Sequence, residues 1–225
     1  MTRIYIIFIL LLIGCKSEKK EDYYSEEKNK IEFINFNLPT FEKWTECYSD
    51  KSVKFYFDTL SISDKFETLG IYLNNYTFSQ KDSLDILDFE DYAVFVINKN
   101  EQKWKLTRND LERIFQIQKK KTGTINVDKL EALKKVYSDS TFLHPEKPIV
   151  IEEYKPNENI LSALKLIKPY SENHEIVVVY VYNLILVNNH LVYGGYYLNL
   201  NGIESLEKAK EMNNIIMTKF LESNK

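Results

Sequence analysis

Serine and lysine residues three positions apart are the first candidates for catalysis in this sequence. Ser162 and Lys165 have this spacing, at which a lysine amine can activate a serine hydroxyl as a nucleophile. Enzymes built on such a pair place S-x-x-K before S-D-N and K-T-G, whereas the K-T-G here begins at Lys121 and S-D-N is missing. Because Ser205 and Lys208 repeat the spacing, we interpret the match as chance in a lysine-rich chain.

Histidine offers a second route to catalysis, because its pKa lies close to neutrality. The histidines are His144, His174 and His190, and none has another histidine, a cysteine or a carboxylate at ligand spacing. A triad of His174 with Asp139 and Ser140 can be drawn, but no G-x-S-x-G motif supports it. The sequence therefore assigns no catalytic residue, and a non-catalytic role is favoured over an enzyme.

Carboxylates could instead bind a metal ion. The densest acidic cluster consists of Asp82, Asp85, Asp88, Glu90 and Asp91. Calcium needs several oxygens converging on one point, but the EF-hand spacing and its central glycine are absent. We therefore expect a solvated connection here, and neither a metal ion nor a cofactor.

Tyrosines in the C-terminal third are the strongest sign of a binding face. Two apolar runs, residues 176–187 and 191–198, flank Asn188 and Asn189, which accept the positive φ of a two-residue hairpin turn. The possible binding face consists of five hairpin tyrosines: Tyr180, Tyr182, Tyr193, Tyr196 and Tyr197. Strands direct alternate residues to opposite sides, so one set should be core and the other could line a cleft or partner-binding face. The alternative is that helices cover both faces of the hairpin.

The N-terminus predicts the destination of the protein. Arg3 precedes ten apolar residues at 4–13, an h-region of signal-peptide length that is too short to span a bilayer. The h-region ends in Leu12, Ile13, Gly14 and Cys15, and these four residues resemble the lipobox of bacterial lipoproteins. The resemblance implies that residues 1–14 are removed and that the Cys15 thiol accepts diacylglycerol while its amine is acylated. Such multiple acylation gives an effectively permanent anchor. The alternatives are an ordinary secretory peptide with a chance cysteine and an uncleaved short anchor.

The segment after the anchor, residues 15–30, is mostly charged and is expected to be a flexible tether. Lys16 stands where an aspartate would resemble an inner-membrane retention signal, so the outer membrane of the cell envelope is favoured. Whether the protein faces the periplasm or the cell surface stays open.

The formal net charge of −3 does not indicate the basic surface that nucleic-acid binding requires. With Cys15 lipidated, Cys47 is expected to be a buried small side chain or, alternatively, an intermolecular or redox site.

Apolar periodicity predicts the regular elements. Strands are expected at residues 31–38, 53–57, 69–78, 92–97 and 148–151, besides the hairpin. Helices are expected after Thr107 and Asp110, over residues 128–136 and 160–167, and at the C-terminus. The last helix should be capped by Asn201 and present one apolar side, with Leu206, Ala209, Met212, Ile216 and Phe220. Gly194 and Gly195 suggest a bulge or a close approach of another group.

These elements predict a single α+β domain over residues 31–225, in which helices cover one face of a mostly antiparallel sheet. A hairpin and a closing amphipathic helix end the chain, and this unit is similar in topology to the end of PsbP/Mog1-type domains. The favoured function is a membrane-anchored envelope lipoprotein whose domain binds an envelope protein or a ligand. The alternatives are an envelope hydrolase with an unrecognised active site and an immunity-type protein.

Overall fold

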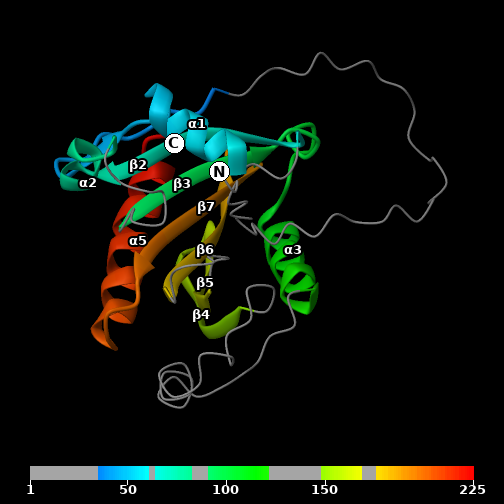
Figure 1. Ribbon diagram of the computed structural model, residues 1–225. Helices are drawn as coiled ribbons and strands as arrows, with labels where there is room; N and C mark the ends of the chain where they lie inside the picture. The colour runs from blue at the N-terminus through cyan, green and yellow to red at the C-terminus, as the bar shows by residue number, and fades with distance from the viewer. Residues whose placement is uncertain (1–34, 61–63, 83–90, 122–147, 169–175) are drawn as a thin grey trace.

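The computed structural model describes residues 35–60, 64–82, 91–121, 148–168 and 176–225, and Figure 1 shows their arrangement. The strands of this described part form one antiparallel sheet in the order β1-β2-β3-β7-β6-β5-β4. They are β1 (Trp44–Glu46), β2 (Phe66–Asn74), β3 (Tyr92–Asn98), β4 (Ile149–Asn157), β5 (Ile160–Ile167), β6 (Val178–Val187) and β7 (His190–Asn199). The helices are α1 (Lys51–Leu60), α2 (Asn75–Ser79), α3 (Arg108–Lys121) and α5 (Glu204–Glu222). The predicted α+β class, the hairpin and the closing helix are confirmed.

The β6–β7 hairpin lies at the centre of the sheet. Asn188 and Asn189 have φ values of 48° and 66°, as the predicted two-residue turn requires. The pairing of the two strands continues without a bulge through both glycines. A Cβ on Gly194 would lie 2.5 Å from the Met217 sulfur, and a Cβ on Gly195 would lie 3.3 Å from the Tyr180 ring. The glycines therefore allow close packing on both sides of the sheet.

One face of the sheet packs against α5. Leu206, Ala209, Ile216 and Phe220 of the helix are all fully buried there, in the largest core cluster. The Phe220 ring stacks on Phe95 of β3 with centroids 4.2 Å apart. This apolar seam holds the closing helix against the central strands.

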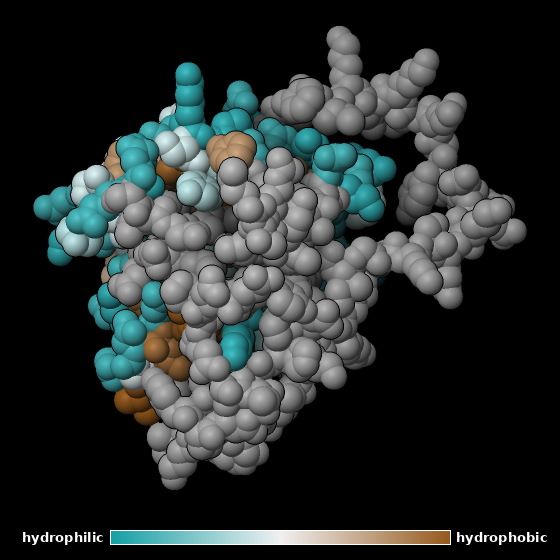
Figure 2. Space-filling model, viewed as in Figure 1, coloured by the Kyte–Doolittle hydropathy of each residue, from teal (hydrophilic) through white to brown (hydrophobic). Residues whose placement is uncertain are grey.

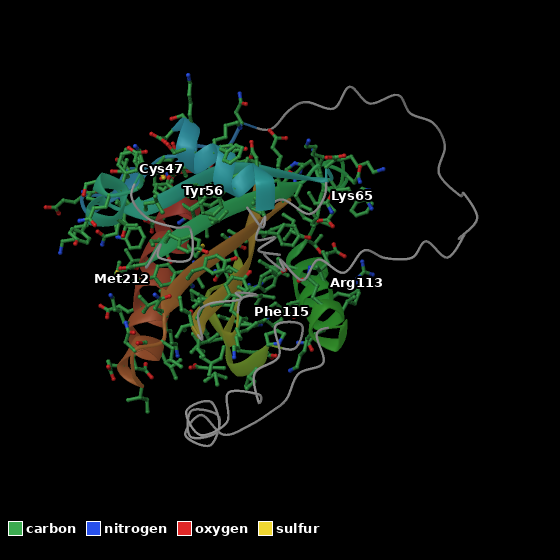
Figure 3. All side chains as sticks on the ribbon, viewed as in Figure 1. Cys47, Tyr56, Lys65, Arg113, Phe115 and Met212 are labelled. Carbon is green, nitrogen blue, oxygen red and sulfur yellow. The ribbon has the colours of Figure 1, made fainter. Side chains whose placement is uncertain are left out.

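The opposite face also carries helices, so the expectation that helices cover one face of the sheet is wrong, and the alternative that helices cover both faces of the hairpin is confirmed. Leu111 and Phe115 of α3 pack on the β5–β6–β7 region, and Val53 of α1 packs on β2. Figure 1 shows the sheet between α5 and α3, and in Figure 3 Phe115 lies on the sheet side of α3. The reason is visible in β6, where neighbouring residues such as Leu184 and Ile185 are both fully buried.

Two predicted elements have the wrong type over their whole length. Residues 160–167 form strand β5 rather than a helix, because seven of its eight residues are buried and apolar residues face both sides. Residues 53–57 belong to helix α1 rather than a strand. The Asp50 carboxylate accepts the backbone N–H of Ser52 at 3.0 Å and of Val53 at 3.4 Å, which begins the helix. The alternating residue Phe55 is 69 % exposed, so the pattern did not mark a half-buried strand.

Helix boundaries follow local capping. The predicted capping box is confirmed, since Asp110 accepts the Thr107 N–H at 3.0 Å and Thr107 Oγ1 accepts the Asp110 N–H at 3.3 Å. Residues 75–79, expected to be extended in part, form α2 because the Asn74 side chain accepts the N–H of Tyr76. The predicted Asn201 cap of α5 is wrong, since the N-cap residue is Ile203 and makes no side-chain cap. The predicted helix over 128–136 lies outside the described residues, as do residues 1–34 with the signal peptide and tether.

Candidate functional site

Four of the five predicted tyrosines share the face of the sheet that carries α1 and α3. Tyr180 and Tyr197 stack with ring centroids 4.6 Å apart, and Tyr182 lies 6.3 Å from Tyr180 and 6.4 Å from Tyr193. Tyr92 of β3 extends this series by stacking 4.6 Å from Tyr197. We call these five side chains the tyrosine row. It crosses β3, β7 and β6, and the sequence did not indicate that Tyr92 belongs to it.

Tyr196 is separated from the row by the sheet. Its side chain is fully buried on the α5 face, 6.0 Å from the Trp44 ring between centroids. Its hydroxyl donates to the Asp91 carboxylate, whose second oxygen lies 3.6 Å from Lys208 Nζ. Tyr196 is therefore a core residue of the opposite face and does not line the same surface as the other four.

The row is not uniformly accessible. Tyr193 and Tyr197 are each 4 % exposed, whereas Tyr180 and Tyr182 are half-buried. The Tyr182 hydroxyl donates to Gln118 of α3, and the Tyr193 hydroxyl donates to Glu101 at 2.6 Å. Burial raises the pKa of these tyrosines, so their hydroxyls stay neutral at physiological pH. Tyr180 and Tyr182 are therefore the more exposed rings of the row, and both stay partly covered.

Lys165 lies beside these two rings. It pairs with Tyr180 across β5 and β6, and its Nζ lies 4.9 Å from the centroid of the Tyr182 ring. The side chain is only 9 % exposed, and burial lowers the pKa of its amine to about 8, although the charge of Glu153 acts in the opposite direction. Within the described part of the chain, its amine has neither a hydrogen bond nor an ion pair.

A comparison with other lysines shows how unusual this arrangement is. Six lysines of the described residues lie over aromatic rings. Lys54, Lys81 and Lys210 are each paired with a carboxylate, and Lys219 donates to a backbone carbonyl. Lys103 is exposed to water. Lys165 is the buried member of the set, and among the described residues its amine has no oxygen partner.

The serine of the S-x-x-K match lies on the other side of the sheet from Lys165. Ser162 is fully buried on the α5 face, where its hydroxyl donates to the Asn183 side chain at 2.6 Å. Asn183 and Asn213 of α5 exchange two further hydrogen bonds of 2.7 and 3.0 Å. An odd spacing along a strand puts two side chains on opposite faces, so Lys165 cannot activate Ser162. The serine instead satisfies a buried amide network.

The other candidate residues show no convergence within the described ranges. His190 begins β7, and burial lowers the pKa of its ring. Cys47 is 1 % exposed, its thiol donates to the Ile71 carbonyl, and burial raises its pKa to about 12, which keeps it un-ionised. No cluster of three histidine, cysteine or acidic residues suited to a metal is found among the described residues. His144, His174 and most of the acidic cluster lie outside them.

The remaining surface offers weaker candidates. Figure 2 shows mainly hydrophilic residues over α1 and α2, with hydrophobic residues toward one end of α5. Among the described residues, a hollow of about 430 Å³ is lined by Lys51, Lys54, Phe55 and Asp58 of α1. Lys54 already pairs with Asp58 there at 3.3 Å, so the hollow contains no unsatisfied charge comparable to Lys165.

Comparison with protein-family models, curated proteins and solved structures gave no match. Among the described helices, none combines the length and apolar character needed to cross a bilayer. The functional argument therefore depends on the chemistry of the site itself.

Proposed function

We propose that this protein is an envelope lipoprotein, anchored through Cys15, whose domain binds a small ligand on the face formed by Tyr180, Tyr182 and Lys165. The lipobox at residues 12–15 supports the anchor, and Lys16 favours the outer membrane. The single observation that carries the binding proposal is the Lys165 amine, which is buried beside two half-buried rings and lacks an oxygen partner in the described part. Burying such a group without a partner is unfavourable unless something else satisfies it.

The burial of Lys165 also favours a small ligand over a large partner. Its side chain is 9 % exposed, so the flat surface of another protein would meet the tyrosine rings before it met the amine. A small molecule, in contrast, can place one group against the amine and its body against Tyr180 or Tyr182. Aromatic side chains with fixed rings are suited to this kind of contact.

Binding can be tested with benzamide, a small neutral aromatic probe, by saturation-transfer NMR on the full-length protein in detergent. Contact with the wild type should be weak but measurable, and Tyr182→Leu should remove it. Tyr76→Leu is the matched control, because Tyr76 is 71 % exposed on α2 and lies outside the row. Equal signals from all three proteins, or none from the wild type, would contradict the proposed face. Thermal melts of each variant establish that the fold is retained.

A further inference from the structure

The face formed by Tyr180, Tyr182 and Lys165 has one chemical preference that its residues define. Its rings offer an apolar, polarisable surface, and its one cation lies recessed between them and β5. The lysine amine has three donor hydrogens and no acceptor in the described part to receive them. A ligand that satisfies the site must therefore bring the acceptor with it.

We infer that the ligand is a small organic anion, with a carboxylate or similar oxyanion that pairs with Lys165 and an apolar or aromatic body that lies against Tyr180 and Tyr182. This inference rests on the proposed function and adds the charge and shape of the ligand to it. A charge-assisted hydrogen bond in a desolvated site is stronger than one between neutral groups. The anion would supply the kind of oxygen partner that Lys54, Lys81, Lys210 and Lys219 obtain from the protein itself.

The charges around Lys165 are compatible with an incoming anion. Glu153 of β4 is the nearest acidic influence, and its carboxylate is engaged by Lys119 of α3 at 2.9 Å. On β6, Tyr180 and Tyr182 stay neutral because burial raises the pKa of both phenols. Glu101 accepts a hydrogen bond from the Tyr193 hydroxyl, and burial raises the pKa of the Glu101 carboxyl as well. The unpaired charge of the face is thus positive.

The test compares benzoate with benzamide, which have nearly the same shape and differ in charge. At pH 7 the full-length wild type should bind benzoate about tenfold more tightly than benzamide, the ratio that one charged hydrogen bond provides. Lys165→Met should abolish this ratio without abolishing benzamide binding. At pH 9.5 the ratio should also fall in the wild type, since the Lys165 amine is then mostly neutral while benzoate remains charged.

Lys54→Met is the matched control. Lys54 also lies over a tyrosine ring, 4.1 Å from the Tyr48 centroid, but it is exposed and paired with Asp58. Its replacement should leave the benzoate preference unchanged. If both probes bind equally, or if the preference survives in Lys165→Met, the anion inference is overturned while the binding face stands. If neither probe binds, the proposed function itself fails.

Discussion

Replacing Lys165 with methionine should stabilise the protein, and the gain should depend on pH. Methionine fills nearly the same volume with an apolar chain and removes a buried amine that has no oxygen partner in the described part. The pKa of Lys165 is lowered from 10.5 to about 8, mainly by burial. Because one pKa unit corresponds to about 1.4 kcal/mol, charging this amine in the native state costs about 3 kcal/mol more than in the unfolded chain.

The pH dependence follows from the two pKa values. Below pH 8 the amine is protonated in both states, so the full penalty is present. Between about pH 8 and 10.5 the native amine is neutral while the unfolded chain still binds a proton, so the wild type becomes more stable as the pH rises. The difference in free energy of unfolding between Lys165→Met and the wild type should therefore decrease by about 2 kcal/mol between pH 7 and pH 9.5.

Urea unfolding of the wild type and of Lys165→Met at several pH values from 7 to 9.5 measures this difference in free energy of unfolding. The neighbouring Tyr180 and Tyr182 do not interfere in that range, because burial raises their pKa values. Lys54→Met should show no comparable narrowing, since Lys54 is exposed and its pKa is raised by its partners Tyr48 and Asp58. A difference in free energy of unfolding between Lys165→Met and the wild type that stays constant with pH would refute the argument that the Lys165 amine is desolvated.

Three further predictions concern the anchor and the α5 face. Cys15→Ser should move the protein from the detergent phase to the aqueous phase in phase partitioning, and retention in the detergent phase would contradict the lipid anchor. Asn213→Leu should lower the free energy of unfolding by about 2 kcal/mol, because the buried Asn183 side chain loses both of the hydrogen bonds that it exchanges with Asn213; an unchanged urea midpoint would show that the network is dispensable. Gly194→Ala should destabilise by about 1–3 kcal/mol through contact with the Met217 sulfur, 2.5 Å away, and the effect should shrink in a Met217→Ala background. Fully additive effects would exclude that contact.

The hairpin and the closing helix could be predicted because local signals agree with tertiary structure there. The two asparagines fix the turn, and the long apolar runs beside it can only be buried strands. The capping box at Thr107 was equally reliable, because both of its hydrogen bonds join residues close in sequence. Such features need no knowledge of the rest of the chain.

Strand β5 shows why the candidate site was only partly predicted. Its apolar residues match a helical spacing as well as a strand buried on both faces, and periodicity cannot separate the two. Once β5 is recognised as a strand, Lys165 becomes a conspicuous charge within an otherwise uncharged buried run. The helix interpretation hid that signal. The tyrosines were found by their density and divided between two faces by alternation along the strands, but the helices that cover each face depended on tertiary packing.

The most direct test of the binding face is an NMR measurement of the pKa of Lys165, with its signal assigned by comparison with Lys165→Met. In the free protein the pKa should lie near 8, as burial of the amine requires. In the presence of saturating benzoate it should rise by about one unit, because a tenfold tighter pairing with the charged amine corresponds to that shift. A pKa near 10.5 in the free protein, or one that benzoate leaves unchanged, would contradict a recessed cation that awaits an anionic ligand.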